Sequence, residues 1–92
     1  MLEKDREKII ENTRLLLKKR RIELGISMNR AGEIAGLSQQ TISYVERGLR
    51  DPTLGTLLRI CEALEIKISD LLEKAENPES KSLRALVDAE RH

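Results

Sequence analysis

Glycine and serine residues recur at short intervals in the middle of this chain, and they restrict it to short helices joined by tight turns. Gly25, Gly36 and Gly48 each follow a stretch with helical periodicity, and Ser27 and Ser38 stand where new helices would begin. Glycine readily adopts the left-handed conformation that ends many helices, and a serine hydroxyl accepts a hydrogen bond from an amide of the first turn. The pattern predicts one helix between Ser27 and Gly36 and a second between Ser38 and Gly48.

Apolar residues at steps of three and four extend the helical pattern to both sides of this segment. They predict a long first helix over residues 3–24, whose apolar side comprises Ile9, Ile10, Thr13, Leu16, Leu17 and Leu24. Proline cannot continue a helix, so Pro52 lies in a loop and Thr53 is predicted to cap a fourth helix. The expected apolar stripe of that helix comprises Leu54, Leu57, Leu58, Ile60, Cys61 and Leu64.

Two further helices are predicted near the C-terminus. Ser69 is expected to cap a fifth helix that contains Leu71 and Leu72, and Ser80 is expected to start a sixth after the break at Asn77–Pro78. The predicted fold class is therefore all-α. It comprises a five-helix domain with an extended N-terminal helix and a short C-terminal helix.

Composition excludes several classes of protein. The 92 residues contain no Trp or Phe and one Tyr, so one small domain with an aliphatic core is expected. A single cysteine, Cys61, excludes an internal disulfide and suits the cytoplasm. Neither Cys61 nor His92 has partners at metal-ligand spacing, and no catalytic set is visible, so we expect no metal, no cofactor and no enzyme activity. No apolar run approaches the roughly 20 residues of a membrane span.

The charge of the chain is unevenly distributed, although the net charge is only +1. Residues 14–50 carry eight basic and three acidic side chains, which gives +5. Residues 51–92 carry six basic and nine acidic side chains, which gives −3, and residues 1–13 contribute −1. Positive charge gathered in one segment can neutralise nucleic-acid phosphates, although mixed charge can also serve solubility alone.

The basic segment also contains the spacing of two packed helices joined by a turn. A small residue, Gly32, stands four positions before the turn residue Gly36, and apolar Leu37, Ile42 and Val45 follow at the spacing that holds the second helix against the first. This is the pattern of a helix-turn-helix, whose second helix enters the major groove of DNA.

The predicted second helix of this motif has an outer face suited to reading bases. Ile42 and Val45 point toward the core, while Gln40, Ser43, Tyr44 and Arg47 point outward and Gln39 lies at the N-terminal tip. A glutamine amide can accept from adenine N6 and donate to N7 at once. The alternative is that the glutamines are ordinary polar residues of a first turn and that the tyrosine is merely exposed.

At this point the chain resembles the Cro/repressor-type, or Xre-family, helix-turn-helix domain of bacteria and phages. The resemblance lies in RIELGIS (21–27), AGLSQQTISYVERG (35–48), RDPTL (50–54), LLRICEAL (57–64) and SDLL (69–72). It implies a lambda-repressor-like domain of five helices that binds double-stranded DNA as a homodimer on a near-palindromic operator.

The resemblance also implies roles for individual residues. Base contacts fall on Gln39, Gln40, Ser43 and Tyr44, and contacts to the DNA backbone fall on Ser27, Asn29, Arg47 and Arg50. An arginine late in the first helix pairs with the glutamate of the recognition helix in the family, which here implies Arg21 with Glu46. Two positions depart from the family pattern. Met28 replaces a frequent glutamine, so either Asn29 or backbone amides are expected to take its contact, and Glu65 replaces a frequent glycine.

Two functions follow from the sequence. The first is a sequence-specific transcriptional regulator of the cytoplasm, a repressor or autoregulator that acts as a homodimer, with activation left open. The second is an antitoxin-like adaptor that binds DNA and a protein partner through its terminal segments. We expect a helical extension over residues 1–13, the DNA-binding domain over 14–76 and a tail over 77–92, and we expect the extension and the tail to build or enlarge the dimer interface. For the basic run at Lys18 to Arg21, a phosphate contact by Lys18 or Arg20 and a solvated face remain alternatives.

Overall fold

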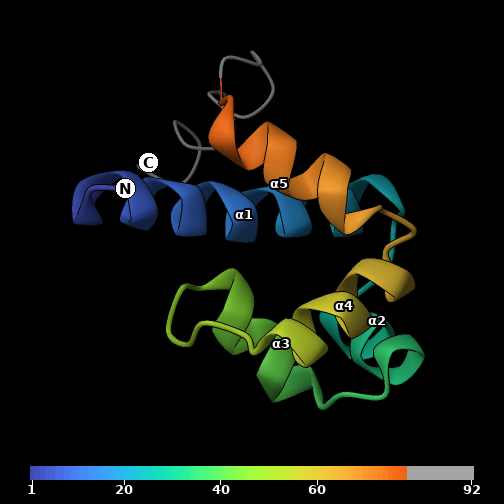
Figure 1. Cartoon of the computed structure of the whole chain (residues 1–92). Coiled ribbons are helices and arrows are strands. Elements are labelled where there is room, and N and C mark those ends of the chain that lie inside the picture. Colours follow the sequence, from blue (N-terminus) through green and yellow to red (C-terminus); the bar gives the residue numbers. More distant parts are fainter. Residues whose placement is uncertain (79–92) are drawn as a thin grey trace, which may run out of the picture.

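The computed structural model describes residues 1–78, and these residues form five helices and no strand. The helices are α1 (Glu3–Glu23), α2 (Met28–Ala35), α3 (Gln39–Glu46), α4 (Leu54–Ala63) and α5 (Ile68–Glu76). Helix α1 lies between α5 on one side and the layer of α2, α3 and α4 on the other (Figure 1). The prediction of an all-α, five-helix domain with a long first helix is confirmed. The sixth helix, predicted from Ser80, lies outside the described residues.

Side-chain caps begin the three middle helices at the residues that the sequence predicts. The hydroxyl of Ser27 accepts from the amide of Arg30 at 3.0 Å, and that of Ser38 accepts from the amide of Thr41 at 3.1 Å. Thr53 caps α4 in the same way, through the amide of Thr56 at 3.1 Å. Each bond satisfies an amide that has no partner within its own helix, so these starts are decided locally.

The predicted cap of α5 is wrong. Helix α5 begins at Ile68, its N-cap is Lys67 without a side-chain hydrogen bond, and Ser69 lies inside the first turn. Ile66 and Ile68 are partly buried against the core on either side of this start. Packing of these two isoleucines, rather than a capping hydroxyl, therefore accounts for where α5 begins.

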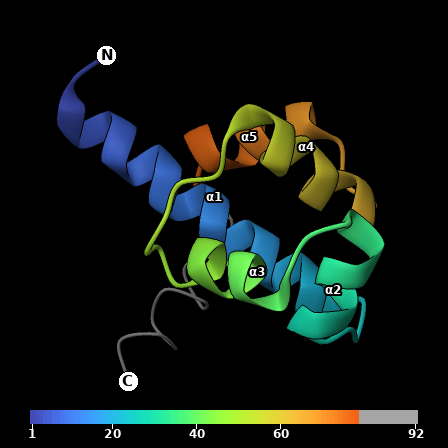
Figure 2. The same cartoon turned by 90° about the horizontal axis from the view of Figure 1, so that it is seen from below.

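Helix α1 buries more of its circumference than the apolar periodicity predicts. Leu15, Leu16 and Leu17 are all buried, although the sequence pattern omitted Leu15 from the core. Three consecutive helical residues point in three directions about 100° apart, so they are all buried only where a helix is covered on two sides. Packing against both α5 and α3 provides that cover (Figure 2).

The predicted stripe of α4 is partly wrong. Ile60, Cys61 and Leu64 are buried and Leu57 is partly buried, as expected, but Leu54 is 67% exposed and Leu58 is 43% exposed. Positions 57, 60, 61 and 64 form one face at helical spacing, and this face packs toward the core. Leu58 lies outside that face and Leu54 lies in the first turn, so α4 presents apolar side chains to solvent as well.

Candidate DNA-binding surface

A close backbone approach sets the geometry between α2 and α3. Gly36 ends α2 with φ 72°, and the amide of Leu37 donates to the carbonyl of Gly32 at 2.8 Å. A Cβ atom added to Gly32 would lie 2.7 Å from the carbonyl oxygen of Leu37. The small residue that the spacing requires is therefore a glycine for steric reasons, because even alanine would push the turn away from α2.

Helix α3 divides into a buried side and a polar side along its whole length. Ile42, Val45 and Glu46 are buried, which agrees with the face that the sequence assigned to the core. The residues on the opposite side are polar: Gln39, Gln40 and Arg47 are exposed, and Ser43 and Tyr44 are half-buried. The four residues expected to contact bases therefore lie on one accessible surface.

A buried ion pair attaches the C-terminal end of α3 to α1. The guanidinium of Arg21 donates to the carboxylate of Glu46 through Nε at 2.6 Å and Nη2 at 2.9 Å. It also donates to the carbonyl of Ile26 at 2.9 Å. The hydrogen bonds to Glu46 raise the pKa of Arg21, against an opposing effect of burial. The Arg21–Glu46 pair that the resemblance implies is present in the structure, and it explains the carboxylate on the core side of α3.

A second arginine of α1 holds the same helix end, and the sequence analysis missed it. Arg14 donates from Nη1 to the backbone carbonyl of Glu46 at 2.7 Å. The C-terminal carbonyls of a helix lack partners within the helix and attract cations. The basic residue alone does not predict this contact, because Arg14 and Glu46 are 32 positions apart in the chain.

Arg20, in contrast, lies at the end of α4. Its Nε donates to the carbonyl of Leu64 at 2.9 Å, and Nη2 donates to that of Glu65 at 3.4 Å. Glu65 has φ 54°, in the left-handed region where the family commonly has glycine. Arg20 therefore caps a strained helix end and is not simply a solvated side chain, while its phosphate contact stays a prediction.

The residues expected to contact the DNA backbone lie at two helix ends. Ser27 and Asn29 flank the first residue of α2, and Asn29 donates to the carboxylate of Glu33 at 3.3 Å. Met28 between them is partly buried against the core, which leaves the neighbouring polar side chains outside. Arg47 and Arg50 follow α3 and are exposed.

Tyr44 links the two groups of predicted DNA contacts. Its hydroxyl accepts a hydrogen bond from the side-chain amide of Gln40 at 2.5 Å. The guanidinium carbon of Arg50 lies 5.0 Å from the centre of the tyrosine ring, which is the geometry of a cation–π interaction.

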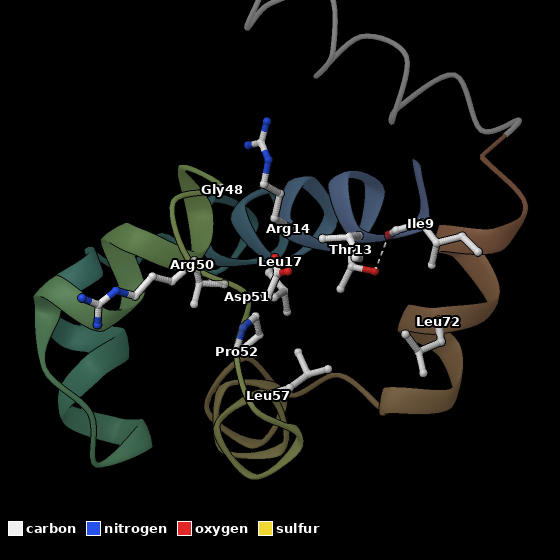
Figure 3. A pocket seen from close by; sticks show the side chains of 12 residues that line it. Ile9, Thr13, Arg14, Leu17, Gly48, Arg50, Asp51, Pro52, Leu57 and Leu72 are labelled. Atoms are coloured by element: carbon white, nitrogen blue, oxygen red, sulfur yellow. Dashed lines mark hydrogen bonds between the residues drawn. The ribbon is translucent and has the colours of Figure 1, made fainter. Parts of the chain in front are cut away.

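An apolar groove opens beside this surface, between α1, the loop after α3, α4 and α5 (Figure 3). Its volume is about 290 Å³. Ile9 and Thr13 of α1 face it, together with Pro52, Leu57 and Leu72 (Figure 3). Ile10 also lines the groove and is 42% exposed. The N-terminal extension of α1 therefore forms one wall of an open apolar hollow.

Residues 1–78 contain neither a candidate group of metal ligands nor a candidate membrane-spanning helix. Cys61 is buried in the core, and desolvation raises the pKa of its thiol. Among these residues no group of three His, Cys, Asp or Glu side chains is arranged to hold a metal ion. None of the five helices is both long enough and apolar enough to span a bilayer.

Comparison with known proteins agrees with this geometry. The sequence profile described as "Helix-turn-helix" matches residues 17–71, so the chain belongs to this family of DNA-binding transcription regulators, of the Xre type. The family resemblance noted from the sequence is confirmed.

Individual relatives extend the comparison. The chain is 34% identical over 55 residues to the uncharacterised HTH-type transcriptional regulator YgzD of Bacillus subtilis strain 168. The matched segment covers 60% of this chain and 83% of that protein. It also resembles the crystal structure of a point mutant of the restriction-modification controller protein C.Esp1396I. That match has a TM-score of 0.70 and 24% identity, and it covers 78% of this chain and 97% of the other, which establishes a shared fold.

Proposed function

We propose that this chain is a sequence-specific repressor or autoregulator that places α3 in the major groove of its operator. Gln39, Gln40, Ser43 and Tyr44 face the bases. The phosphates that flank these bases are contacted from two helix ends. One contact group is Ser27 and Asn29 at the start of α2, and the other is Arg47 and Arg50 after α3. The observation that carries this proposal is the continuous polar face of α3, backed by buried Ile42, Val45 and Glu46.

Selection of bound duplexes from random oligonucleotides tests the proposal directly. The purified chain is expected to enrich one near-palindromic sequence at moderate ionic strength. Gln40→Ala is then expected to relax the preference at one base step, at a cost of about 1–3 kcal/mol. Enrichment of no sequence would contradict the proposal, and an unchanged preference in Gln40→Ala would remove Gln40 as a reader.

The proposal includes a homodimer, for which an exposed apolar face provides the contact surface. We assign to this dimer face four large apolar side chains that are at least 36% exposed, namely Ile10, Leu54, Leu58 and Leu72. Ile10 and Leu72 line the groove, whose wall also includes Asp51 and Pro52 of the loop that follows α3. A second copy seated across this face would lie next to the DNA-binding surface. The two recognition helices of the dimer, one from each copy, would then enter successive major grooves about 34 Å apart.

Sedimentation of a matched pair of variants tests the dimer face. Leu58→Glu introduces a charge on this face and is expected to give monomers that bind DNA weakly. Ile22→Glu, at a position on α1 that is 54% exposed and outside the face, is expected to leave the dimer intact. Equal dimerisation of both variants would show that the second copy binds elsewhere.

A reporter gene placed behind the selected operator then distinguishes repression from activation.

The antitoxin-like adaptor is the second candidate, and the groove is the observation that favours it. An apolar groove with a wall from α1 suits the apolar side of a helix from a protein partner. In that case Ile10→Glu would abolish co-purification of a protein encoded nearby and leave DNA binding unchanged. Loss of DNA binding together with the dimer would favour the regulator. The tail over residues 77–92 is tested by a chain that ends at Glu76, whose unchanged dimer would exclude a role for the tail.

A further inference from the structure

Tyr44 lies between the residue best suited to read a base and an arginine suited to bind a phosphate. The amide Nε2 of Gln40 donates to its hydroxyl, and the guanidinium of Arg50 lies over its ring. The backbone carbonyl of Tyr44 accepts the amides of Leu49 at 2.9 Å and Arg50 at 3.4 Å. One residue therefore contacts Gln40 through its hydroxyl and Arg50 through both its ring and its backbone.

The hydrogen bond from Gln40 leaves the amide able to read an adenine. A glutamine NH₂ group has two hydrogens, and the carbonyl oxygen is a separate acceptor. When one hydrogen is donated to Tyr44, the other can still donate to adenine N7, and the oxygen can still accept from N6. The bond to the phenol fixes the plane of the amide before DNA arrives, which reduces the rotamer entropy lost on binding.

The contact between Tyr44 and Arg50 likewise orients the arginine side chain before it binds a phosphate. Arg50 belongs to the loop between α3 and α4, where it is exposed. The ring of Tyr44 and the loop residues Arg50, Asp51 and Pro52 line one shallow hollow. A guanidinium over an aromatic face is attracted by the negative charge of that face. The guanidinium of Arg50 therefore lies against the ring of Tyr44 on α3 while the residue remains exposed to solvent.

We propose that Tyr44 is a positioning residue that couples base reading by Gln40 to phosphate binding by Arg50. This inference rests on the proposed function and deepens it, because it assigns Tyr44 a role besides its own position facing the bases. Changes at Gln40 and Tyr44 should then be non-additive in base preference. Changes at Tyr44 and Arg50 should be non-additive in the salt dependence of binding.

Tyr44→Phe separates the two contacts, because it removes the hydroxyl and keeps the ring. The variant is expected to lose about two- to tenfold of the preference at the base step read by Gln40, the value of one hydrogen bond. Its slope of log affinity against log salt concentration should equal that of the wild type. The double variant Gln40→Ala/Tyr44→Phe should show the same preference at that step as Gln40→Ala alone. Gln39→Ala serves as the control, and its effect should add to that of Tyr44→Phe.

Tyr44→Leu removes the ring as well, and tests the contact with Arg50. Its salt slope is expected to fall by up to about 1, the loss expected for Arg50→Ala, because one phosphate contact is weakened. Adding Arg50→Ala to Tyr44→Leu should then change the slope less than Arg50→Ala does in the wild type. Circular dichroism checks that each variant is folded. Additive effects of Gln40→Ala and Tyr44→Phe, together with an unchanged slope in Tyr44→Leu, would overturn the proposal.

A readout without DNA keeps this inference separate from the proposed function. In the free protein, the side-chain amide resonances of Gln40 are expected to shift in Tyr44→Phe, and those of Gln39 are expected to stay unchanged. If the shift occurs and the chain prefers no sequence, the positioning contact exists and the proposed function fails. If no shift occurs, the positioning role fails whatever the chain binds.

Discussion

Two groups of arginines contribute to the same basic segment but have different environments. Arg14, Arg20 and Arg21 of α1 bind carbonyls or a carboxylate inside the molecule. Arg47 and Arg50, which follow α3, are exposed and lie on the proposed DNA-binding surface. At least three of the eight basic side chains in residues 14–50, which carry a net charge of +5, therefore have partners within the chain. Part of that charge holds the recognition helix and the end of α4 in place.

The largest expected loss of stability comes from breaking the buried ion pair between Arg21 and Glu46. In Arg21→Ala, the carboxylate of Glu46 remains buried without its partner, so the free energy of unfolding is expected to fall by about 3–5 kcal/mol. Urea denaturation followed by circular dichroism measures the loss. Arg30→Ala is the control, because the Arg30–Glu33 pair is more than half exposed and should contribute less than about 1 kcal/mol. Similar losses in both variants would contradict a special role for the α1 arginine.

Measuring both stability and the salt dependence of DNA binding distinguishes the arginines of α1 from those that follow α3. Arg20→Ala removes hydrogen bonds to the end of α4 and is expected to lower the free energy of unfolding by about 1–2 kcal/mol, with an unchanged salt slope of DNA binding. Arg50→Ala is expected to do the reverse, with a slope lowered by about 1 and unchanged stability. Denaturation and binding titrations at several salt concentrations measure both. A lowered slope in Arg20→Ala would place this arginine among the phosphate contacts.

The strained residue beside Arg20 offers a smaller test. Glu65 has φ 54°, where a side chain costs about 1 kcal/mol relative to glycine. Glu65→Gly is therefore expected to raise the free energy of unfolding by about 1 kcal/mol, whereas Glu65→Ala keeps the Cβ atom and should give no such gain. Urea denaturation compares the two variants. Equal stability of both would show that Arg20 caps an unstrained helix end.

The smallest effect is expected at Gly55 in the first turn of α4. An added Cβ atom would meet only the hydroxyl of Thr53, at 4.0 Å, so Gly55→Ala should gain up to about 1 kcal/mol from helix propensity. Gly36→Ala is the opposite case, because φ is 72° and the new atom would lie 3.1 Å from Arg59. Sedimentation of Gly55→Ala also measures whether this substitution affects dimerisation. A weakened dimer would mean that Gly55 allows a close approach of the second copy beside Leu54.

The sequence predicted the elements whose ends depend on near neighbours. Caps such as Ser27 and Ser38 bond to an amide three residues away, so residue order alone was sufficient to place them. Leu15 and Ser69 were misjudged because their environments depend on distant packing: α1 is covered on two sides, and α5 begins where two isoleucines reach the core. The family resemblance supplied the Arg21–Glu46 pair, which spacing alone could not have indicated.

Residue order was sufficient to place α2, α3 and α4, their turns and one polar helix face, because these depend on interactions within one or two turns of the chain. The folded structure shows which arginines have partners within the chain, which leucines of α4 stay exposed and how Tyr44 contacts Gln40 and Arg50. These outcomes depend on contacts between elements and on side-chain orientation. For Arg14 and Arg20, the partners lie 32 and 44 positions away, and only packing brings such groups together.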